Sequence, residues 1–364
     1  MSSRDPGAPR GLRLGSLRGV PVYLGWTWLI FAAVVIVIVG QSFGGGGLLG
    51  YLVGLGYAVL LLVTVLVHEA AHALTAQWAG LKVYRVVADL WGGHTTYEPG
   101  NAGPGKSALI AAAGPLANVA LGLIALAVLP LMPNGVARYL VGGFAFLNFI
   151  LAAFNLLPGL PLDGGQLVQA LVWRVTGDRN MGLIVAGWTG RLVTLAVLAA
   201  WVLVPLAQGR QLDTSIIWVV LIGMFMWSGA TMAIKQGTVL RRVGKAALGQ
   251  VMTPAVAIPS DLSVARAMTA PGVPVVLEGL GRPYALLDQN AVSAVPEHLR
   301  DTTPVTAVST PQPLGWVVEA DPAQGVEQVI PALQGEPNVV VVTQHGHVVG
   351  LVTVGDVNRV ISGR

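Results

Sequence analysis

Long apolar runs recur along the first two thirds of the chain. A helix needs about 20 predominantly apolar residues to cross the hydrocarbon core of a bilayer. Six runs meet this need, at about residues 20–39, 50–78, 107–131, 136–157, 183–206 and 214–234. The first is longer than the core of a signal peptide and lacks a small-residue cleavage site, so we expect it to be retained. The pattern predicts a polytopic α-helical membrane protein with about six transmembrane helices.

The pattern changes after Arg242, where short strand-like and helical stretches replace the apolar runs. An internal repeat is visible in this tail. Its halves cover about 249–296 and 302–361, and each has the pattern of helix, strand, turn, strand and helix. We therefore expect a soluble α/β domain after the membrane part. The predicted parts are an N-terminal segment at 1–19, a membrane domain at 20–240 and the tail at 241–364.

Composition supports a membrane protein and limits its chemistry. Hydrophobic residues make up 54% of the chain and charged residues only 10%, and the mean hydropathy is +0.69. The absence of cysteine excludes disulfides and thiolate metal ligands. The net charge of +4 is compatible with a nucleic-acid partner. However, the basic residues fall mainly between the apolar runs, so membrane topology explains them better and no nucleic acid is expected.

The placement of basic residues predicts an orientation. They concentrate before the first run and after the second, fourth and sixth runs, whereas the remaining loops hold only Arg138 and Arg210. Cytoplasmic loops are rich in lysine and arginine. Both ends of the chain are therefore expected in the cytoplasm. Arg191 falls within the fifth run, and we expect it either to snorkel to the inner face or to mark an interfacial lead-in.

The second run contains the segment His68–His72, with sequence HEAAH. Histidines four residues apart lie on one face of a helix, and Glu69 stands beside the first of them. This arrangement fits a zinc ion held by two imidazoles, with a carboxylate to deprotonate bound water. A satisfied polar patch in a helical bundle is the alternative. Ionisable groups inside a membrane are expensive and usually functional, which favours the metal site.

A catalytic zinc site needs a third protein ligand, and Asp163 is the strongest candidate. The segment from Asn155 to Asp163 is broken by prolines, and irregular backbone at membrane depth generally lines a cavity. An N-cap of a following helix is the alternative role for Asp163. Asn155 is placed to donate a hydrogen bond to a developing oxyanion, or alternatively to cap a helix end.

Two further segments lie between the second and third runs and within the third. Residues 82–98 alternate with period two around a Gly-Gly pair, which predicts a β-hairpin that lies over the site and offers its edge to an extended peptide. His94 in this segment could bind metal, but it is expected to be an ordinary loop histidine. In the segment Gly114–Asn118, the small residues favour close helix packing and Asn118 can bond across helices.

Three segments, His68–His72, Gly114–Asn118 and Asn155–Gly165, resemble the signature segments of the site-2 protease family of intramembrane zinc metalloproteases, in the same order and spacing. Ala70 and Ala71 stand where that family often has Leu-Gly, at positions that do not touch metal. The roles implied by the resemblance are one Zn²⁺ per chain held by His68, His72 and Asp163, a catalytic acid/base at Glu69, and Asn155 near the scissile carbonyl.

The resemblance implies an endopeptidase that cleaves single-pass membrane proteins, such as membrane-bound regulators of transcription, in a bacterial plasma membrane. A transporter or channel regulated by its tail is one alternative, although no inverted repeat is visible in the six runs. A catalytically dead relative is another. The intact pattern of metal ligands and Glu69 argues against both.

The tail resembles a tandem pair of CBS domains. The resemblance implies that Thr353 contacts the phosphate and Asp356 the ribose of an adenine nucleotide such as ATP, ADP or AMP. The first half departs from that pattern, because Ala285 and Ala291 stand where the family has glycine and aspartate. At most one nucleotide site is therefore expected. A purely structural pair that serves homodimerisation is the alternative.

Overall fold

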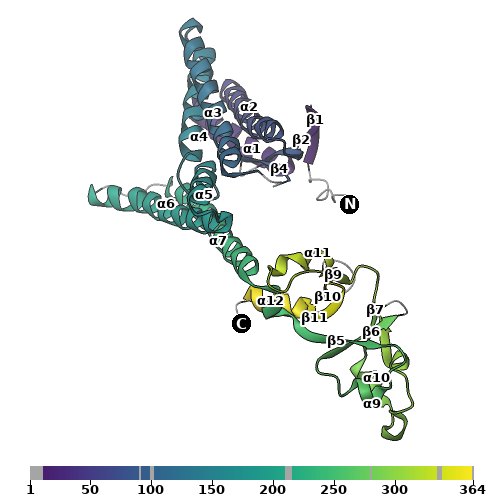
Figure 1. Ribbon diagram of the computed structural model, residues 1–364. Helices are drawn as coiled ribbons and strands as arrows, with labels where there is room; N and C mark the ends of the chain where they lie inside the picture. The colour runs from purple at the N-terminus through teal and green to yellow at the C-terminus, as the bar shows by residue number, and fades with distance from the viewer. Residues whose placement is uncertain are drawn as a thin grey trace. The chain divides into compact units, whose positions relative to one another are not determined.

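A computed structural model describes residues 11–89, 92–98, 102–209, 215–278, 281–333 and 338–362. The chain divides into two compact units, the first ending at Gly237 and the second beginning at Thr238 (Figure 1). The first unit holds the long helices, and the second holds a separate sheet with short helices.

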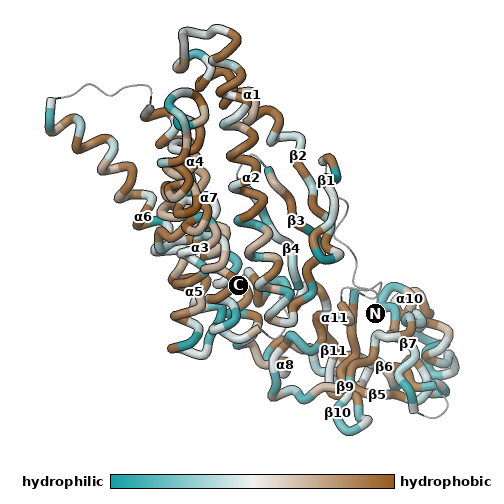
Figure 2. The backbone as a smooth tube through the Cα atoms, turned by 90° about the horizontal axis from the view of Figure 1, so that it is seen from above, coloured by the Kyte–Doolittle hydropathy of each residue, from teal (hydrophilic) through white to brown (hydrophobic). Residues whose placement is uncertain are grey.

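Apolar helices dominate the first unit (Figure 2). They are α1 (Trp26–Ser42), α2 (Leu48–Trp78), α3 (Pro104–Val128), α4 (Val136–Asn155), α5 (Asp163–Thr176), α6 (Arg179–Ala207) and α7 (Ser215–Lys245). Five helices in the described part of the chain are long and apolar enough to cross a membrane, namely α2, α3, α4, α6 and α7. These helices confirm a multi-pass membrane architecture.

The first predicted span requires correction. Residues 20–25 form a strand, and α1 begins only at Trp26. With 17 residues, α1 extends about 26 Å at 1.5 Å per residue, which is short of the roughly 30 Å hydrocarbon core. The apolar run thus combines a strand with a shorter helix, and hydropathy alone does not separate the two.

A four-stranded sheet accompanies the helices of the first unit. Its strands are β1 (Gly11–Leu17), β2 (Val20–Gly25), β3 (Val83–Asp89) and β4 (Gly92–Tyr97), in the order β1-β2-β3-β4. The hairpin β3–β4 confirms the predicted strand pair. The pairing of β1 with β2 was not predicted, since no strand was expected in the N-terminal segment 1–19. Residues 1–10 lie outside the described residues. The parallel pairing of β2 with β3 joins segments about 60 residues apart, a contact that local pattern does not reveal.

Glycines allow the helices of the first unit to approach closely. A Cβ on Gly54 of α2 would lie 2.6 Å from the carbonyl oxygen of Ile36 in α1. A Cβ on Gly187 of α6 would lie 2.6 Å from Ile234 Cγ1 in α7. Small residues at such crossings are typical of membrane helices, which associate through packing rather than through the hydrophobic effect.

The second unit is a seven-stranded sheet with short helices. Its helices are α8 (Leu248–Val251), α9 (Val264–Ala267), α10 (Gln289–Ala294), α11 (Ile330–Leu333) and α12 (Val354–Ser362). Its strands are β5 (Thr253–Pro259), β6 (Val273–Glu278), β7 (Arg282–Leu287), β8 (Ser309–Pro311), β9 (Val317–Glu319), β10 (Val339–Gln344) and β11 (His347–Thr353). The sheet order is β8-β7-β6-β5-β11-β10-β9. A soluble α/β domain therefore follows the membrane helices, as predicted.

The internal repeat is visible in the strand pairing. In the first half β5 pairs parallel with β6, which pairs antiparallel with β7. In the second half β9, β10 and β11 repeat these relations. Strands of one half also pair with strands of the other. Strand β8 of the second half pairs with β7 of the first, and the start of β5 of the first half pairs with β11 of the second. Ala285 faces Val276 as Gly350 faces Val342, so the predicted alignment of the halves holds at this position.

Candidate metal centre

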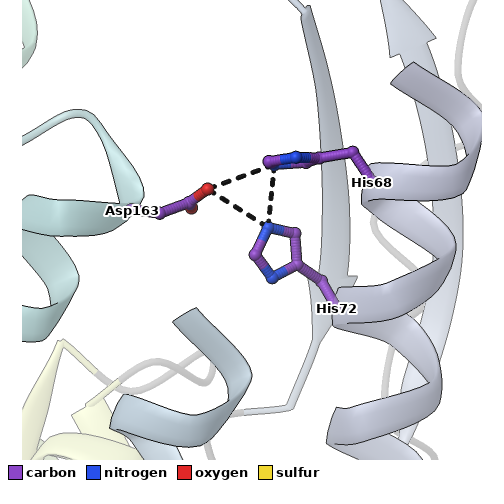
Figure 3. Close-up of side chains that lie close together, drawn as sticks. All are labelled: His68, His72 and Asp163. Carbon is purple, nitrogen blue, oxygen red and sulfur yellow. Dashed lines mark hydrogen bonds and ion pairs between the residues drawn. The ribbon is translucent and has the colours of Figure 1, made fainter. Parts of the chain in front are cut away.

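Helix α2 brings two histidines to one buried face. His68 and His72 are 8% and 7% exposed, and their Nε2 atoms lie 3.1 Å apart. The carboxylate of Asp163 approaches from the start of α5. Its Oδ2 atom lies 3.1 Å from Nε2 of His68 and 3.4 Å from Nε2 of His72 (Figure 3). The structure therefore brings together the three residues that the sequence predicts as metal ligands.

The segment before Asp163 is irregular, and α6 supports it. Residues 156–162 form turns between α4 and α5, and the backbone N–H of Leu160 donates to the carbonyl of Ala186 in α6. Leu162 is the N-cap residue of α5, and no side chain caps this helix. Asp163 is therefore not an N-cap. Its carboxylate is directed at the histidines. In the irregular segment before it, Gly159, Leu160 and Leu162 are buried in protein, which suits irregular backbone at membrane depth.

Helix α3 leaves space for the two histidine rings and orients one of them. A Cβ on Gly114 would lie 2.3 Å from His72 Nε2 and 2.6 Å from His68 Cε1. One turn earlier, the carbonyl of Ile110 accepts a hydrogen bond from His72 Nδ1 at 2.7 Å. A hydrogen bond at Nδ1 fixes the tautomer and leaves Nε2 available for a metal. The packing role expected for Gly114 thus extends to the site itself.

The donor set fits a zinc ion. One donor atom from each of His68, His72 and Asp163 lies within 4.8 Å of the others. Tetrahedral ligands at about 2.0–2.1 Å from zinc are separated by roughly 3.3 Å, and the observed separations are 3.1–3.4 Å. Nδ1 of His68 is buried without a hydrogen-bond partner among the described residues, and the buried Oδ2 of Asp163 has none there apart from its ion-pair contacts with the two histidines. Three protein ligands leave a coordination position for water or substrate.

Glu69 lies beside this cluster and is held by strand β4. Its side chain is buried, with the residue 5% exposed. The Thr95 hydroxyl lies 2.8 Å from Glu69 Oε2 and 3.1 Å from the Glu69 carbonyl oxygen, so it donates to these acceptors. A Cβ on Gly93 would lie 2.4 Å from Glu69 Cγ. Thr95 was not predicted as a site residue, since a threonine in a short strand carries no catalytic signature.

The predicted position of the hairpin turn was wrong. The Gly-Gly pair was expected to form the turn, but both glycines lie in β4, where Gly92 pairs with Asp89 and Gly93 with Ala88. The physical reason is the close approach of β4 to Glu69, which leaves no room for a side chain at position 93. His94, the next residue of β4, is exposed and does not belong to the histidine–aspartate cluster.

The predicted asparagines are not part of the cluster. Asn155 ends α4 and is half-buried, and no hydrogen bond joins it to His68, His72 or Asp163. Asn118 is 1% exposed, and its Oδ1 has no hydrogen-bond partner within the described part of the chain. A buried hydrogen bond between helices does occur elsewhere in the unit. Asn148 Nδ2 of α4 donates to Thr64 Oγ1 of α2 at 3.1 Å, a pair that the sequence analysis did not identify.

Thr353 and Asp356 form a capping box at the start of α12. The Thr353 hydroxyl accepts from the Asp356 N–H at 3.1 Å, and Asp356 Oδ2 accepts from the Thr353 N–H at 2.8 Å. Arg359 forms an ion pair with Oδ1 of the same carboxylate. Asp356 therefore has a structural task. Its contact with a nucleotide stays a prediction.

Comparisons with known proteins agree with this geometry. The apolar helices and the histidine–aspartate cluster together define a multi-pass membrane protein with a buried metal site of three ligands. The model of "Peptidase family M50" matches residues 56–135 and 130–198. "Putative zinc metalloprotease Rip3" of Mycobacterium tuberculosis is 30% identical over 96% of this chain and 92% of its own length. The chain belongs to peptidase family M50 and is thus a membrane zinc metalloprotease.

Other similar proteins cover parts of the chain. "Putative zinc metalloprotease sll0528" of Synechocystis is 33% identical over 60% of this chain, and the match spans 58% of that relative. The solved "Site-2 Protease from Methanocaldococcus jannaschii" is 25% identical over 62% of this chain and 95% of that structure, with a TM-score of 0.46. A solved CBS domain of a membrane protein from Sphaerobacter thermophilus is 20% identical over 36% of this chain and 96% of that structure, with a TM-score of 0.28.

Proposed function

We propose that this protein is a zinc-dependent intramembrane endopeptidase that cleaves single-pass membrane proteins. The observation that carries the proposal is the buried cluster of His68, His72 and Asp163 beside a glutamate that is itself held in place. The cluster alone would also suit a metal store. A carboxylate fixed next to the ligands is the additional part that hydrolysis needs.

The chain supplies the binding and proton-transfer groups of this reaction. His68, His72 and Asp163 would hold the zinc ion, which would supply a Lewis acid for the scissile carbonyl and lower the pKa of a bound water. Glu69 accepts the proton of the attacking water on a carboxylate oxygen and delivers it to the leaving amine nitrogen. The Thr95 hydroxyl holds Glu69 Oε2 during both transfers. Asn155 is proposed to donate to the carbonyl oxygen of the scissile bond.

Strand β4 is proposed to hold the substrate in an extended form. It is the last strand in the sheet order, so one of its edges has no strand partner among the described residues. Exposed edges of this kind bind peptides by adding a strand. A helical carbonyl is hydrogen-bonded and shielded, so the substrate helix must unwind first. Helix-breaking residues near the cleavage site should therefore favour cleavage.

We propose that both ends of the chain face the cytoplasm, since basic residues concentrate on that side of the predicted spans. His72 lies six residues before the end of α2, a depth of roughly 9 Å at 1.5 Å per residue. In this orientation, water reaches the site from the cytoplasmic side. Membrane-bound regulators of transcription are the proposed substrates, and a bacterial plasma membrane is the proposed location.

Regulation by the tail is a separate prediction. It rests on the likeness of residues 350–356 to a nucleotide-binding segment, and a homodimer through the tail is the alternative use of the same unit. Calorimetric titration of the full-length protein with AMP, ADP and ATP tests it. Binding that is lost in Asp356→Ala, in a variant whose tail still melts cooperatively, would support the nucleotide site. The absence of binding to the native protein would remove it.

The proposed activity is tested by zinc content and cleavage measured in the same samples. The native protein is expected to hold about one zinc per chain and to cut a model single-pass helix. Glu69→Gln should keep the zinc and lose cleavage, whereas Asp163→Ala should lose both. Glu98→Gln, at an exposed glutamate just beyond β4, is the matched control. Cleavage by Glu69→Gln would overturn the role of Glu69, and a well-folded native protein without zinc would favour the transporter or the dead relative.

A further inference from the structure

Arg191 is a charged residue that the proposed reaction does not use. It lies in the apolar helix α6, and neither α6 nor α7 contains an aspartate or glutamate. No carboxylate pairs with Arg191 among the described residues. An ionisable residue in such a helix is expensive and indicates a functional partner. An anion that neutralises Arg191 would therefore come from outside these two helices.

The guanidinium of Arg191 is fixed in position. Its Cζ atom lies 4.8 Å from the ring centroid of Trp188 and 4.8 Å from that of Trp227. One Nη2 hydrogen bond, 3.0 Å long, reaches Thr231 Oγ1 in α7, while Nε is buried without a hydrogen-bond partner in the described part of the chain. Two rings and a hydroxyl thus hold the cation in place, unlike a side chain that reaches freely into water. A guanidinium has five N–H donors, and those not used here are available to an acceptor.

The contacts of Arg191 adjoin a cavity of about 610 Å³ between α6 and α7. Its walls are mainly apolar and include Leu198 and Val220, whereas Trp227 and Thr231 lie toward its other end. The exposed Lys235 stands one turn beyond Thr231 and also lines the cavity. From Val220 to Lys235 the wall extends about 22 Å along α7. The apolar groove thus ends at Lys235, and two residues of its wall, Trp227 and Thr231, hold the guanidinium of Arg191.

We propose that this groove binds one acidic phospholipid. The hydrocarbon chain lies along the apolar wall, and the phosphate accepts hydrogen bonds from Arg191 and Lys235. Guanidinium groups favour phosphate because the planar donors match its oxygens. The cavity volume falls within the roughly 300–1,000 Å³ typical of ligand sites. A transmembrane peptide would fill the apolar wall equally well, but its hydrocarbon-facing side chains do not supply an anion for the two cations.

Lipid quenching of tryptophan fluorescence tests this site. The full-length protein is reconstituted into phosphatidylcholine vesicles that contain increasing fractions of brominated phosphatidylglycerol or, separately, of brominated phosphatidylcholine. A selective site is expected to give stronger quenching by the acidic lipid at low mole fraction. A cation that contacts the headgroup of a bound acidic lipid favours that lipid roughly fivefold. Arg191→Gln and Lys235→Gln should each lower the selectivity by about that factor.

Arg138→Gln is the control, since this arginine lies near the start of another span and donates to the carbonyl of Leu129; its selectivity should equal that of the native protein. Lys235→Gln changes an exposed side chain, so it tests the site even where Arg191→Gln fails to fold. Equal quenching by the two lipids in the native protein would overturn the proposal. Unchanged selectivity in folded Arg191→Gln and Lys235→Gln would also overturn it. Displacement of the acidic lipid by millimolar inorganic phosphate would assign the site to a free anion instead.

Discussion

The two units bury different kinds of side chain. In the first unit the buried polar residues include His68, Glu69, His72 and Asp163, and the helices meet through glycine and alanine. In the second unit, nine of the twelve largest fully buried side chains of the described chain are found, eight of them valines. The tail is therefore stabilised by an ordinary apolar core, whereas the membrane unit uses its interior for a polar site.

Because the two interiors differ, substitutions in them should separate function from stability. A membrane unit gains little from burying apolar groups, because lipid is as apolar as the protein interior. Its interior positions are free to carry expensive polar groups that serve the site. In the tail, water surrounds the domain, and burial of valine and leucine supplies the driving force for folding. Substitutions at the two interiors should have opposite consequences for metal binding and for tail stability.

The largest effect is expected from Gly114→Ala. The added Cβ would lie 2.3 Å from His72 Nε2, so the imidazoles must move away from their ligand positions. We expect zinc and cleavage to be lost together, while the tail melts as in the native protein. Metal analysis and cleavage of a model helix measure this. Gly105→Ala is the control in the same helix, since nothing lies within 4 Å of its added Cβ; retained zinc in Gly114→Ala would show that the rings do not require this clearance.

The second effect tests the other unit. Leu248 is fully buried and packs in the cluster that contains Val326 and Val329. Leu248→Ala should destabilise the tail by about 2–5 kcal/mol and leave the zinc content unchanged. Denaturant unfolding followed by circular dichroism measures the loss. Leu314→Ala, at a residue that is 98% exposed, should be nearly neutral. Loss of zinc in Leu248→Ala would contradict the separation of the two interiors.

A smaller effect is expected where β4 holds the acid/base. Thr95→Val removes the hydroxyl that donates to Glu69 Oε2 and keeps the shape of the side chain. Cleavage should fall about 10- to 100-fold, the usual cost of losing such a supporting hydrogen bond, while zinc content stays at the native level. Thr95→Ser should restore most of the rate. Equal rates in Thr95→Val and the native protein would show that Glu69 does not depend on this bond.

The smallest effect concerns the capping box of α12. Asp356→Ala should cost about 1 kcal/mol of tail stability, and Asp301→Ala, at an exposed aspartate, should cost nothing measurable. Burial alone raises the pKa of Asp356, but hydrogen bonds from Thr353 and the Arg359 charge hold it below its ordinary 3.8. The stabilisation of the tail by the Asp356 carboxylate is therefore complete above pH 3.8, the pKa of an unfolded aspartate. It is lost as the pH falls through the lower pKa that Asp356 has in the folded protein. Tail melting followed from pH 7 downward should show the difference between Asp356→Ala and the native protein shrink as the pH falls below 3.8.

The sequence predicted features that depend on local pattern or on strong chemistry. The spacing of His68 and His72 on a helix, and the proline-broken approach to Asp163, led to the cluster that the structure assembles. The β3–β4 hairpin and the tail repeat followed from periodicity. In each case the signal lay within a short stretch, or in a residue type that membrane interiors rarely tolerate.

Features that depend on contacts between distant segments could not be predicted. Strand β2 merges with α1 in one apolar run, and only its pairing with β3 distinguishes it. The contact between β4 and Glu69 is not visible in the sequence. Thr95 was therefore not predicted, and Gly93 was assigned to a turn. The role of Gly114 as clearance for two imidazoles also needs the positions of α2 and α3 together.

The exchanged strands of the tail have a consequence for its modularity. Because β8 of the second half completes the sheet beside β7, and β5 of the first half pairs with β11, neither repeat holds all of its own sheet. A chain truncated near residue 300 would expose the edge of β7 and leave β5 without its β11 neighbour. The duplicated sequence thus behaves as one indivisible fold, and a single repeat is not a unit that can be transplanted.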